Sequence, residues 1–118
     1  MSFRDGLERI AGKVDDLLGV AIVDSEGILI QEHRVDPDFD ITSVVAEYSA
    51  FVKAADKASV SMDLGLSQEV TVITETITII IKKINDDYFL LLGAKSEKNM
   101  GKGRFFMKRE AAGFIEEL

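Results

Sequence analysis

The stretch Leu18-Gly19-Val20-Ala21-Ile22-Val23-Asp24-Ser25-Glu26-Gly27 decides the fold, because an apolar run leads directly into a tight turn. Residues 20–24 form a short apolar segment, and residues 28–33 form a second one. The four residues between them, 24–27, end in glycine, which is typical of a β-turn. The sequence therefore predicts a β-hairpin made of these two segments.

A helix is predicted on each side of this hairpin. Residues 3–17 place apolar side chains at helical spacing with charged residues between them, and Gly19 marks the exit. After the hairpin, Asp40 can cap a second helix over residues 41–58 by accepting a backbone N–H bond. Phe51 widens the apolar stripe of that helix, which is made of Ile41, Val44, Val45, Tyr48, Val52 and Ala55.

The second half of the chain predicts a three-stranded meander. Residues 69–75, 76–84 and 88–94 are rich in β-branched and aromatic side chains. Asn85-Asp86-Asp87 supplies one turn, whereas the turn near Thr74-Glu75-Thr76 contains no strong turn residue. In the middle strand Ile77, Ile79 and Ile81 face one way and Ile80 and Ile84 the other, which predicts a sheet covered on both sides.

Residues 95–103 then predict a loop, and a third helix follows with Met107, Ala111, Phe114, Ile115 and Leu118 on its apolar face. The expected order is α-β-β-α-β-β-β-α. We expect an α/β (α+β) fold: a single five-stranded, mostly antiparallel sheet with helices on both faces, in a profilin-like three-layer arrangement.

Composition narrows the classes of function. The chain has 118 residues, which fits one domain over 1–118, and no cysteine, which excludes disulfides and zinc–thiolate sites. Its net charge is −7, so it repels nucleic acid and anionic membranes at long range. The N-terminal residues lack the apolar segment of a signal peptide, and no apolar run approaches the ~20 residues of a membrane span. We expect a cytoplasmic protein that does not insert into membranes.

The usual catalytic patterns are incomplete. Around Gly101-Lys102 the phosphate-binding loop pattern fails twice, because Ser96 stands where glycine is required and Gly103 where a hydroxyl residue is required. His33 is the only histidine, and no serine lies at a spacing that supports a catalytic triad. The sequence thus predicts a protein without catalytic residues or cofactors.

An aspartate-rich segment precedes the second helix. Asp36, Asp38, Asp40 and Glu47 fit four ligand positions of a calcium loop, but Ile41 occupies the position of the required glycine. Helix capping by Asp40 explains the segment better, and we expect no metal site.

A basic cluster stands out in this acidic chain: Lys95, Lys98, Lys102, Arg104, Lys108 and Arg109. One interpretation is a site for an acidic partner surface, or for a phosphate at a helix N-terminus. The other, favoured interpretation is a solvated loop and helix face that pairs with Glu97 and Glu110.

Taken together, these segments resemble the Roadblock/dynein-light-chain family over nearly the whole chain. Residues 18–27 look like the opening hairpin of that family, with an apolar strand before Asp-x-x-Gly. Asn99-Met100-Gly101-Lys102-Gly103-Arg104 resembles its Asn-x-Gly-x-x-Arg entry to the last helix. One departure is the short connection between the third and fourth strands.

The resemblance implies a homodimer in which the third strand lies at the sheet edge and pairs with its twin, while the second helices pack together. The sequence adds a reason, since residues 70–74 contain no proline, lysine or bulge signal that would block edge pairing. How the second-helix stripe divides between core and interface stays open. The expected interface residues are Val44, Val45, Tyr48, Phe51, Val52, Val70, Val72 and Thr74.

The resemblance also implies a partner. Bacterial and archaeal members often pair with small Ras-like GTPases, so the leading hypothesis is a GTPase regulator, either an activator or a scaffold. The alternative is a structural adaptor or motor light chain that leaves nucleotide turnover unchanged, and a small-molecule sensor is a third class. The expected partner-binding residues are Arg34, Glu47, Lys102 and Arg104.

Overall fold

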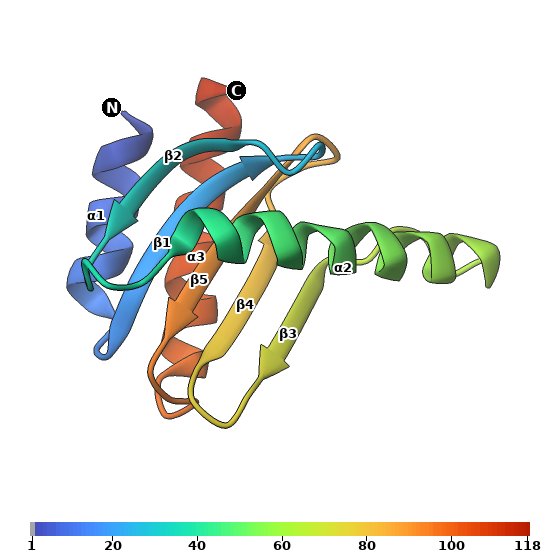
Figure 1. Ribbon diagram of the computed structural model, residues 1–118. Helices are drawn as coiled ribbons and strands as arrows, with labels where there is room; N and C mark the ends of the chain where they lie inside the picture. The colour runs from blue at the N-terminus through green and yellow to red at the C-terminus, as the bar shows by residue number, and fades with distance from the viewer. Residues whose placement is uncertain (1) are drawn as a thin grey trace.

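A computed structural model of the protein describes residues 2–118 and contains a single antiparallel sheet (Figure 1). The five strands lie in the order β2-β1-β5-β4-β3, so β2 and β3 form the two edges. The predicted fold class and element order are confirmed. The elements are α1 (Phe3–Lys13), β1 (Leu17–Asp24), β2 (Leu29–Arg34), α2 (Ile41–Ser61), β3 (Glu69–Ile73), β4 (Thr78–Lys83), β5 (Tyr88–Ala94) and α3 (Met100–Glu117).

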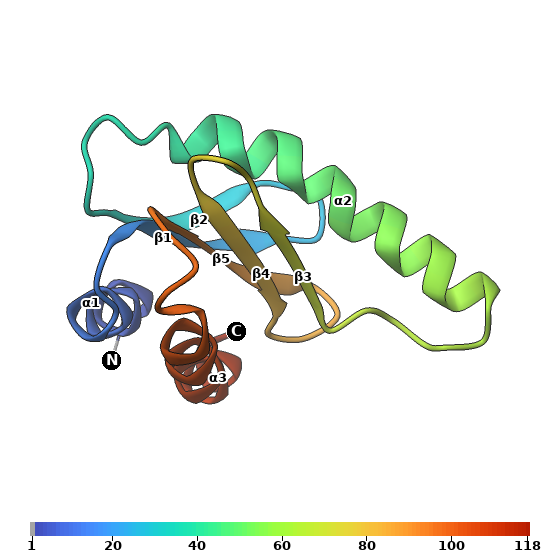
Figure 2. The same ribbon diagram turned by 90° about the horizontal axis from the view of Figure 1, so that it is seen from below.

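The sheet separates two hydrophobic clusters. Helices α1 and α3 lie side by side on one face, and α2 crosses the other face (Figures 1 and 2). In β4, Ile80 packs toward α1 and α3, whereas Ile79 and Ile81 pack toward α2. The predicted coverage of both faces, and the predicted division of these isoleucines, are therefore confirmed.

The first predicted helix is too long, because α1 ends at Lys13. Leu17 and Leu18 begin β1 and are buried on opposite faces of the sheet, one in each cluster. Asp16 makes this switch with a left-handed φ of 61°, and its carbonyl accepts a hydrogen bond from the Lys95 N–H at 2.9 Å. Two adjacent leucines are compatible both with the apolar side of a helix and with a strand that is buried on both faces. This ambiguity explains why the predicted helix extends too far.

The third helix starts earlier than predicted, since α3 begins at Met100 inside the predicted loop 95–103. Gly103 is buried in its first turns, where a Cβ atom would lie 3.6 Å from Leu92 and 3.8 Å from Ile80. These are ordinary van der Waals distances, so an alanine would also fit here, although α3 lies directly on the sheet at this point.

Side-chain hydrogen bonds build the turns between strands. In the turn between β3 and β4, the Thr74 hydroxyl accepts from the N–H groups of Thr76 at 3.3 Å and Ile77 at 3.0 Å. A threonine thus provides the turn that lacked a recognisable signal in the sequence. In the next turn the Asn85 side chain accepts from the N–H groups of Asp87 and Tyr88, both at 2.9 Å, as its composition predicted.

Within residues 2–118, no helix combines the length and the apolar character that are needed to cross a membrane.

Candidate interaction surfaces

Helix α2 is longer than the sheet beneath it. It begins over the sheet, crosses it and continues well past the β3 edge (Figures 1 and 2). Of its 21 residues only Ile41, Val45, Ser49 and Val52 are buried, and all four lie in its first twelve positions. The C-terminal part of α2 is therefore an overhang with no strand of the same chain below it.

The overhang and the loop after it expose apolar side chains. Phe51 is 48% exposed and stacks edge-on against Tyr48, with ring centroids 5.0 Å apart. Val44, Tyr48, Phe51 and Ala55 recur at i, i+4, i+7 and i+11, so they form one side of the helix, here called the α2 flank. Further exposed apolar residues, which lie beyond the end of the predicted helix 41–58, are Val60, Met62, Leu64 and Leu66.

The β3 strand beside this overhang has an open edge. It pairs with β4 in unbroken register from Glu69 opposite Lys82 to Ile73 opposite Thr78, and its other side pairs with no strand in the described part of the chain. Its predicted edge position is confirmed. Val70 and Val72 are half-buried and share the α2 side of the sheet with their partners Ile81 and Ile79.

A polar anchor fixes the overhang relative to the sheet. Asp56 on α2 receives a 2.6 Å bond from Lys83 Nζ on β4 and a 2.9 Å bond from the Ser67 N–H. The Ser67 hydroxyl donates to the same carboxylate. Burial by itself raises the pKa of Asp56, but the bonds from Lys83 and Ser67 outweigh it and hold the pKa below its ordinary value of 3.8.

The cleft next to this anchor is too small for a metabolite. It lies between α2 and the β4–β5 turn, is lined by Ser49, Asp56, Lys83 and Tyr88 among others, and has a volume of about 40 Å³. Such a volume holds about one or two water molecules, whereas small-molecule sites measure roughly 300–1,000 Å³.

The other chemistry-bearing residues of the sequence have structural surroundings. Asp40 caps α2 as predicted, accepting from the Ser43 N–H at 3.2 Å and the Ser43 hydroxyl at 2.7 Å, and the hydroxyl and backbone bonds lower its pKa. His33 is a half-buried residue within β2. Among residues 2–118 there is no group of three or more histidine, aspartate or glutamate residues that could hold a metal ion.

Solved structures of known proteins share this arrangement. A Roadblock/LC7 domain from Streptomyces avermitilis is similar with a TM-score of 0.88 at 14% identity, covering 99% of this chain and 98% of that chain. The chain has the Roadblock/LC7 fold. MglC from Myxococcus xanthus is 28% identical with a TM-score of 0.70, and MglB from the same organism is 15% identical with a TM-score of 0.83; each comparison covers 100% of both chains. No family model and no curated protein sequence matches the chain.

On this Roadblock/LC7 fold the predicted interface residues fall into three environments. Val45 and Val52 are buried against the sheet, so within one chain they belong to the core. Phe51 and Thr74 are exposed. The half-buried ones, which keep part of their surface available, are Val44, Tyr48, Val70 and Val72.

The four predicted partner-binding residues do not come together. Arg34 ends β2, where it pairs with Glu32 at 3.3 Å, and Glu47 is exposed on α2. Lys102 and Arg104 belong to α3, on the opposite face of the sheet. They therefore define two separate regions of the fold.

Arg104 has a specific structural partner. Its Nε donates to both carboxylate oxygens of Glu69, at 3.0 and 2.9 Å, and its guanidinium also donates to the Thr71 hydroxyl at 3.1 Å. Because Glu69 and Thr71 belong to β3, this arginine ties α3 to the edge strand.

Proposed function

We propose that this chain is a cytoplasmic, non-catalytic homodimeric module that binds and regulates a small Ras-like GTPase. The open β3 edge beside the apolar α2 flank is the observation that carries the proposal. The resemblance of the sequence to the Roadblock/dynein-light-chain family, together with the Roadblock/LC7 fold, supports the choice of partner.

The dimer follows from what the single chain leaves uncovered. Two β3 strands can pair antiparallel about a two-fold axis, which joins the two sheets and satisfies the free N–H and C=O groups of both edges. The same axis brings two overhanging α2 helices together, so that Tyr48, Phe51 and their flank neighbours lose contact with water. One solved relative supports self-association, since MglB with a tetrameric arrangement is similar over 92% of this chain at a TM-score of 0.82 and 14% identity.

The test of the dimer is the mass in solution, measured by sedimentation equilibrium over a range of concentrations. Phe51→Glu places a charge in the proposed interface on both copies of the chain, and we expect it to weaken the dimer by about 10²- to 10⁴-fold, the value of two buried aromatic side chains. Phe105→Glu is the matched control, because Phe105 is equally aromatic and exposed but lies on α3. A wild-type protein that remains monomeric at high concentration would refute the dimer.

A second pair of variants tests the strand edge itself. Val72→Lys adds to β3 the kind of charge that natural edge strands use to prevent pairing, and should produce monomers. Gln31→Lys makes the same change on β2, the opposite edge, and should leave the dimer intact.

For the GTPase we propose contact on the α2 side, with Arg34 and Glu47 at the contact. Such a dimer can shift the switch loops of a GTPase only by binding one of their states more tightly than another. An inserted arginine would be worth about 10³–10⁵ in rate, but Arg104 is engaged by Glu69 and Thr71, and Arg34 pairs with Glu32. We therefore propose allosteric reshaping or scaffolding without a supplied arginine.

GTP hydrolysis by a cognate Ras-like GTPase, measured with and without this protein, tests this mechanism. Arg34→Ala and Arg104→Ala should each leave most of any stimulation in place, and a loss of a hundredfold or more in either would overturn the proposal. Glu69→Gln distinguishes a structural role of Arg104 from a role as a supplied catalytic arginine. It removes the ionic partner on β3 and leaves the guanidinium of Arg104 in place. Equal binding to the GDP-bound and GTP-bound states would instead identify a structural adaptor or light chain.

A further inference from the structure

The face of the molecule opposite α2 carries a groove between α1 and α3. Its lining residues are Arg9, Lys13, Phe106, Arg109 and Glu110, and its volume is about 200 Å³. Both helices run along the same face of the sheet, with the α2 overhang on the far side (Figure 2). The groove is therefore remote from the proposed dimer interface.

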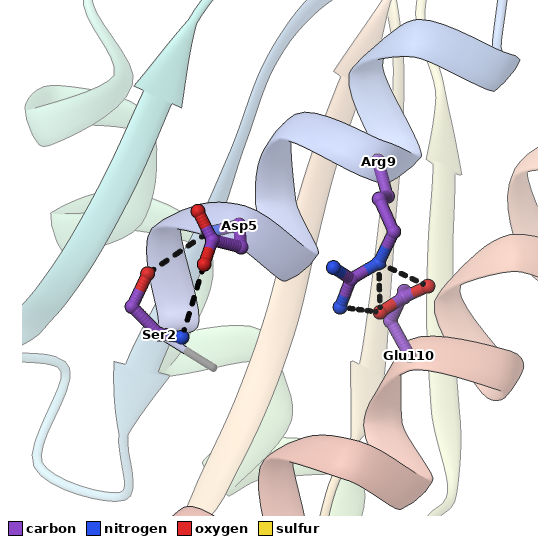
Figure 3. A network of polar contacts seen from close by, with 4 residues as sticks. All are labelled: Ser2, Asp5, Arg9 and Glu110. Atoms are coloured by element: carbon purple, nitrogen blue, oxygen red, sulfur yellow. Dashed lines mark hydrogen bonds and ion pairs between the residues drawn. The ribbon is translucent and has the colours of Figure 1, made fainter.

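The single carboxylate that lines the groove is already neutralised. Glu110 receives bonds from Arg9 Nε at 3.0 and 3.1 Å and from its Nη2 at 2.7 Å, which join α3 to α1 (Figure 3). The Glu110 side chain is only 12% exposed, whereas that of Arg9 is 43% exposed. The ion pair thus holds α1 and α3 together along the groove, and it leaves the Arg9 side chain exposed to solvent while Glu110 is largely covered.

A stripe of basic and aromatic side chains borders the groove. Lys102, Phe105 and Arg109 stand at i, i+3 and i+7 on α3, so they share its outward side over about 10 Å. Phe105 is 60% exposed and lies edge-on to Phe106, with ring centroids 5.0 Å apart. Phe105 is thus a large exposed aromatic with a cation about one turn away on each side of it.

The cations of this stripe lack the partners that the sequence analysis had favoured. The expected pairing with Glu110 is wrong, because that carboxylate belongs to Arg9, and Arg104 pairs with Glu69. Within residues 2–118, Lys13, Lys102, Lys108 and Arg109 form no ion pair, and neither does Glu97. The predicted pairing with Glu97 and Glu110 is therefore wrong, whereas Lys102, Lys108 and Arg109 are exposed to solvent as that interpretation expected.

The charge of the whole chain is unevenly divided. Helices α1 and α3 contain seven lysines and arginines against five acidic residues. The rest of the chain contains seven against sixteen. One layer of an acidic protein is thus positive, and the sign of a local surface selects the charge of the partner that approaches it.

We propose that the α1–α3 groove and its bordering stripe bind an acidic amphipathic helix of a partner protein. The apolar side of that helix packs on Phe105 and Phe106, and its carboxylates face Lys13, Lys102 and Arg109. A groove between two helices fits a third helix read at i, i+3 and i+7 spacing. An anionic membrane fits less well, because membrane anchoring needs several apolar side chains, and Phe105 is the one large apolar side chain within the stripe of Lys102, Phe105 and Arg109.

The test uses a defined probe, a fluorescein-labelled helical peptide of glutamates with leucine at every third and fourth position. We expect the wild-type protein to bind this peptide with an affinity that falls as the salt concentration is raised. It should not bind the same peptide with lysine in place of glutamate. In ¹⁵N-labelled protein, the shifted amide signals should belong to α1 and α3.

Variants then locate the site. Phe105→Glu, and the pair Lys102→Glu with Arg109→Glu, should each weaken binding by at least about tenfold, whereas Ile28→Glu, at an exposed position between β1 and β2, should bind like wild type. The proposal is overturned if wild type does not bind the acidic peptide, or if Phe105→Glu binds equally well. It is also overturned if vesicles of phosphatidylcholine and phosphatidylserine bind the protein while the peptide does not. Because this assay depends neither on the β3–α2 dimer interface nor on a GTPase, its failure would not affect the proposed function.

Discussion

Two exposed phenylalanines on opposite faces of the molecule have nearly identical local geometry. Phe51 lies against Tyr48 and Phe105 against Phe106, each with ring centroids 5.0 Å apart and interplanar angles of 84° and 87°. Their surroundings differ. Phe51 belongs to the apolar α2 flank, whereas Phe105 lies on α3 between Lys102 and Arg109, which have no ionic partner within residues 2–118. The same aromatic geometry therefore stands in an apolar setting on one face of the molecule and in a cationic setting on the other.

The two faces of the sheet explain this difference. On one face α1 and α3 pack closely on each other, with Phe3 and Phe114 edge-on at 5.9 Å and Gly6 leaving room for the Phe114 ring. The sheet is covered by two helices on that face, and the outer surface of these helices carries a net positive charge. On the other face a single helix crosses diagonally and leaves the region beside β3 uncovered, so what it offers is apolar area.

The largest predicted effect concerns the packing of α1 and α3 against each other. Phe114→Ala removes a ring that is 2% exposed, and should lower the free energy of unfolding by about 3–5 kcal/mol. Phe105→Ala on the same helix should change it by less than about 0.5 kcal/mol. Urea unfolding of both variants checks this, and similar losses in both would mean that the α1–α3 face is not packed as described.

The next effect concerns the anchor of the overhang. Asp56→Asn removes the ionic partner of Lys83, whose side chain is 10% exposed, and should cost about 1–3 kcal/mol at neutral pH. Because the pKa of Asp56 is lowered in the folded state, its contribution is present above the ordinary value of 3.8 and is lost as pH falls through the folded-state pKa.

Unfolding of wild type and Asp56→Asn at neutral pH and at strongly acidic pH measures this difference. The gap in stability between the two proteins should close in acid. Asp63→Asn, an exposed carboxylate after the same helix, serves as the control and should show no gap at either pH. A gap that persists unchanged in acid would exclude the ionised carboxylate as its cause.

Much of the fold could be predicted because most segments carry a one-sided or two-sided apolar pattern. The isoleucines of β4 divided correctly between the faces, and Asp40 was correctly identified as a helix cap. Leu17 and Leu18 were misassigned because adjacent apolar residues suit both periods, and the choice depends on pairing with distant Ala94. Sequence spacing could not reveal that Glu110 bonds to Arg9, since the pairing of α1 with α3 is a tertiary contact.

The two surfaces illustrate the same limit. Phe51 and Tyr48 were identified from the helical stripe, but only the overhang of α2 shows which side of that stripe the sheet leaves uncovered. Met62, Leu64 and Leu66 show no helical or strand periodicity in the sequence. The structure shows that they are exposed in the segment that follows the overhang. A pattern predicts that a residue is apolar and periodic, whereas exposure depends on where neighbouring elements end.

A smaller effect distinguishes the two sides of α3. Arg104→Ala breaks the bonds to Glu69 and Thr71 and should cost about 1 kcal/mol, while Arg109→Ala on the outward side should leave stability unchanged. Arg104→Lys should not restore the loss, because an ammonium cannot reach both carboxylate oxygens and the hydroxyl at once. Thermal unfolding of the three variants would contradict this account if lysine fully replaced arginine.

The smallest effect lies at the turn that follows the open edge. Thr74→Val keeps the shape of the side chain but removes the hydroxyl that accepts from Thr76 and Ile77, and should cost about 0.5–1 kcal/mol, because water can partly replace bonds at this exposed site. Thr76→Val, whose hydroxyl makes no bond within residues 2–118, is the control. If two β3 edges pair in a dimer, loosening this turn disorders the interface as well as the hairpin. Sedimentation equilibrium should then show a weaker dimer for Thr74→Val than for Thr76→Val. Equal dimer affinities would show that the turn does not contribute to the dimer interface.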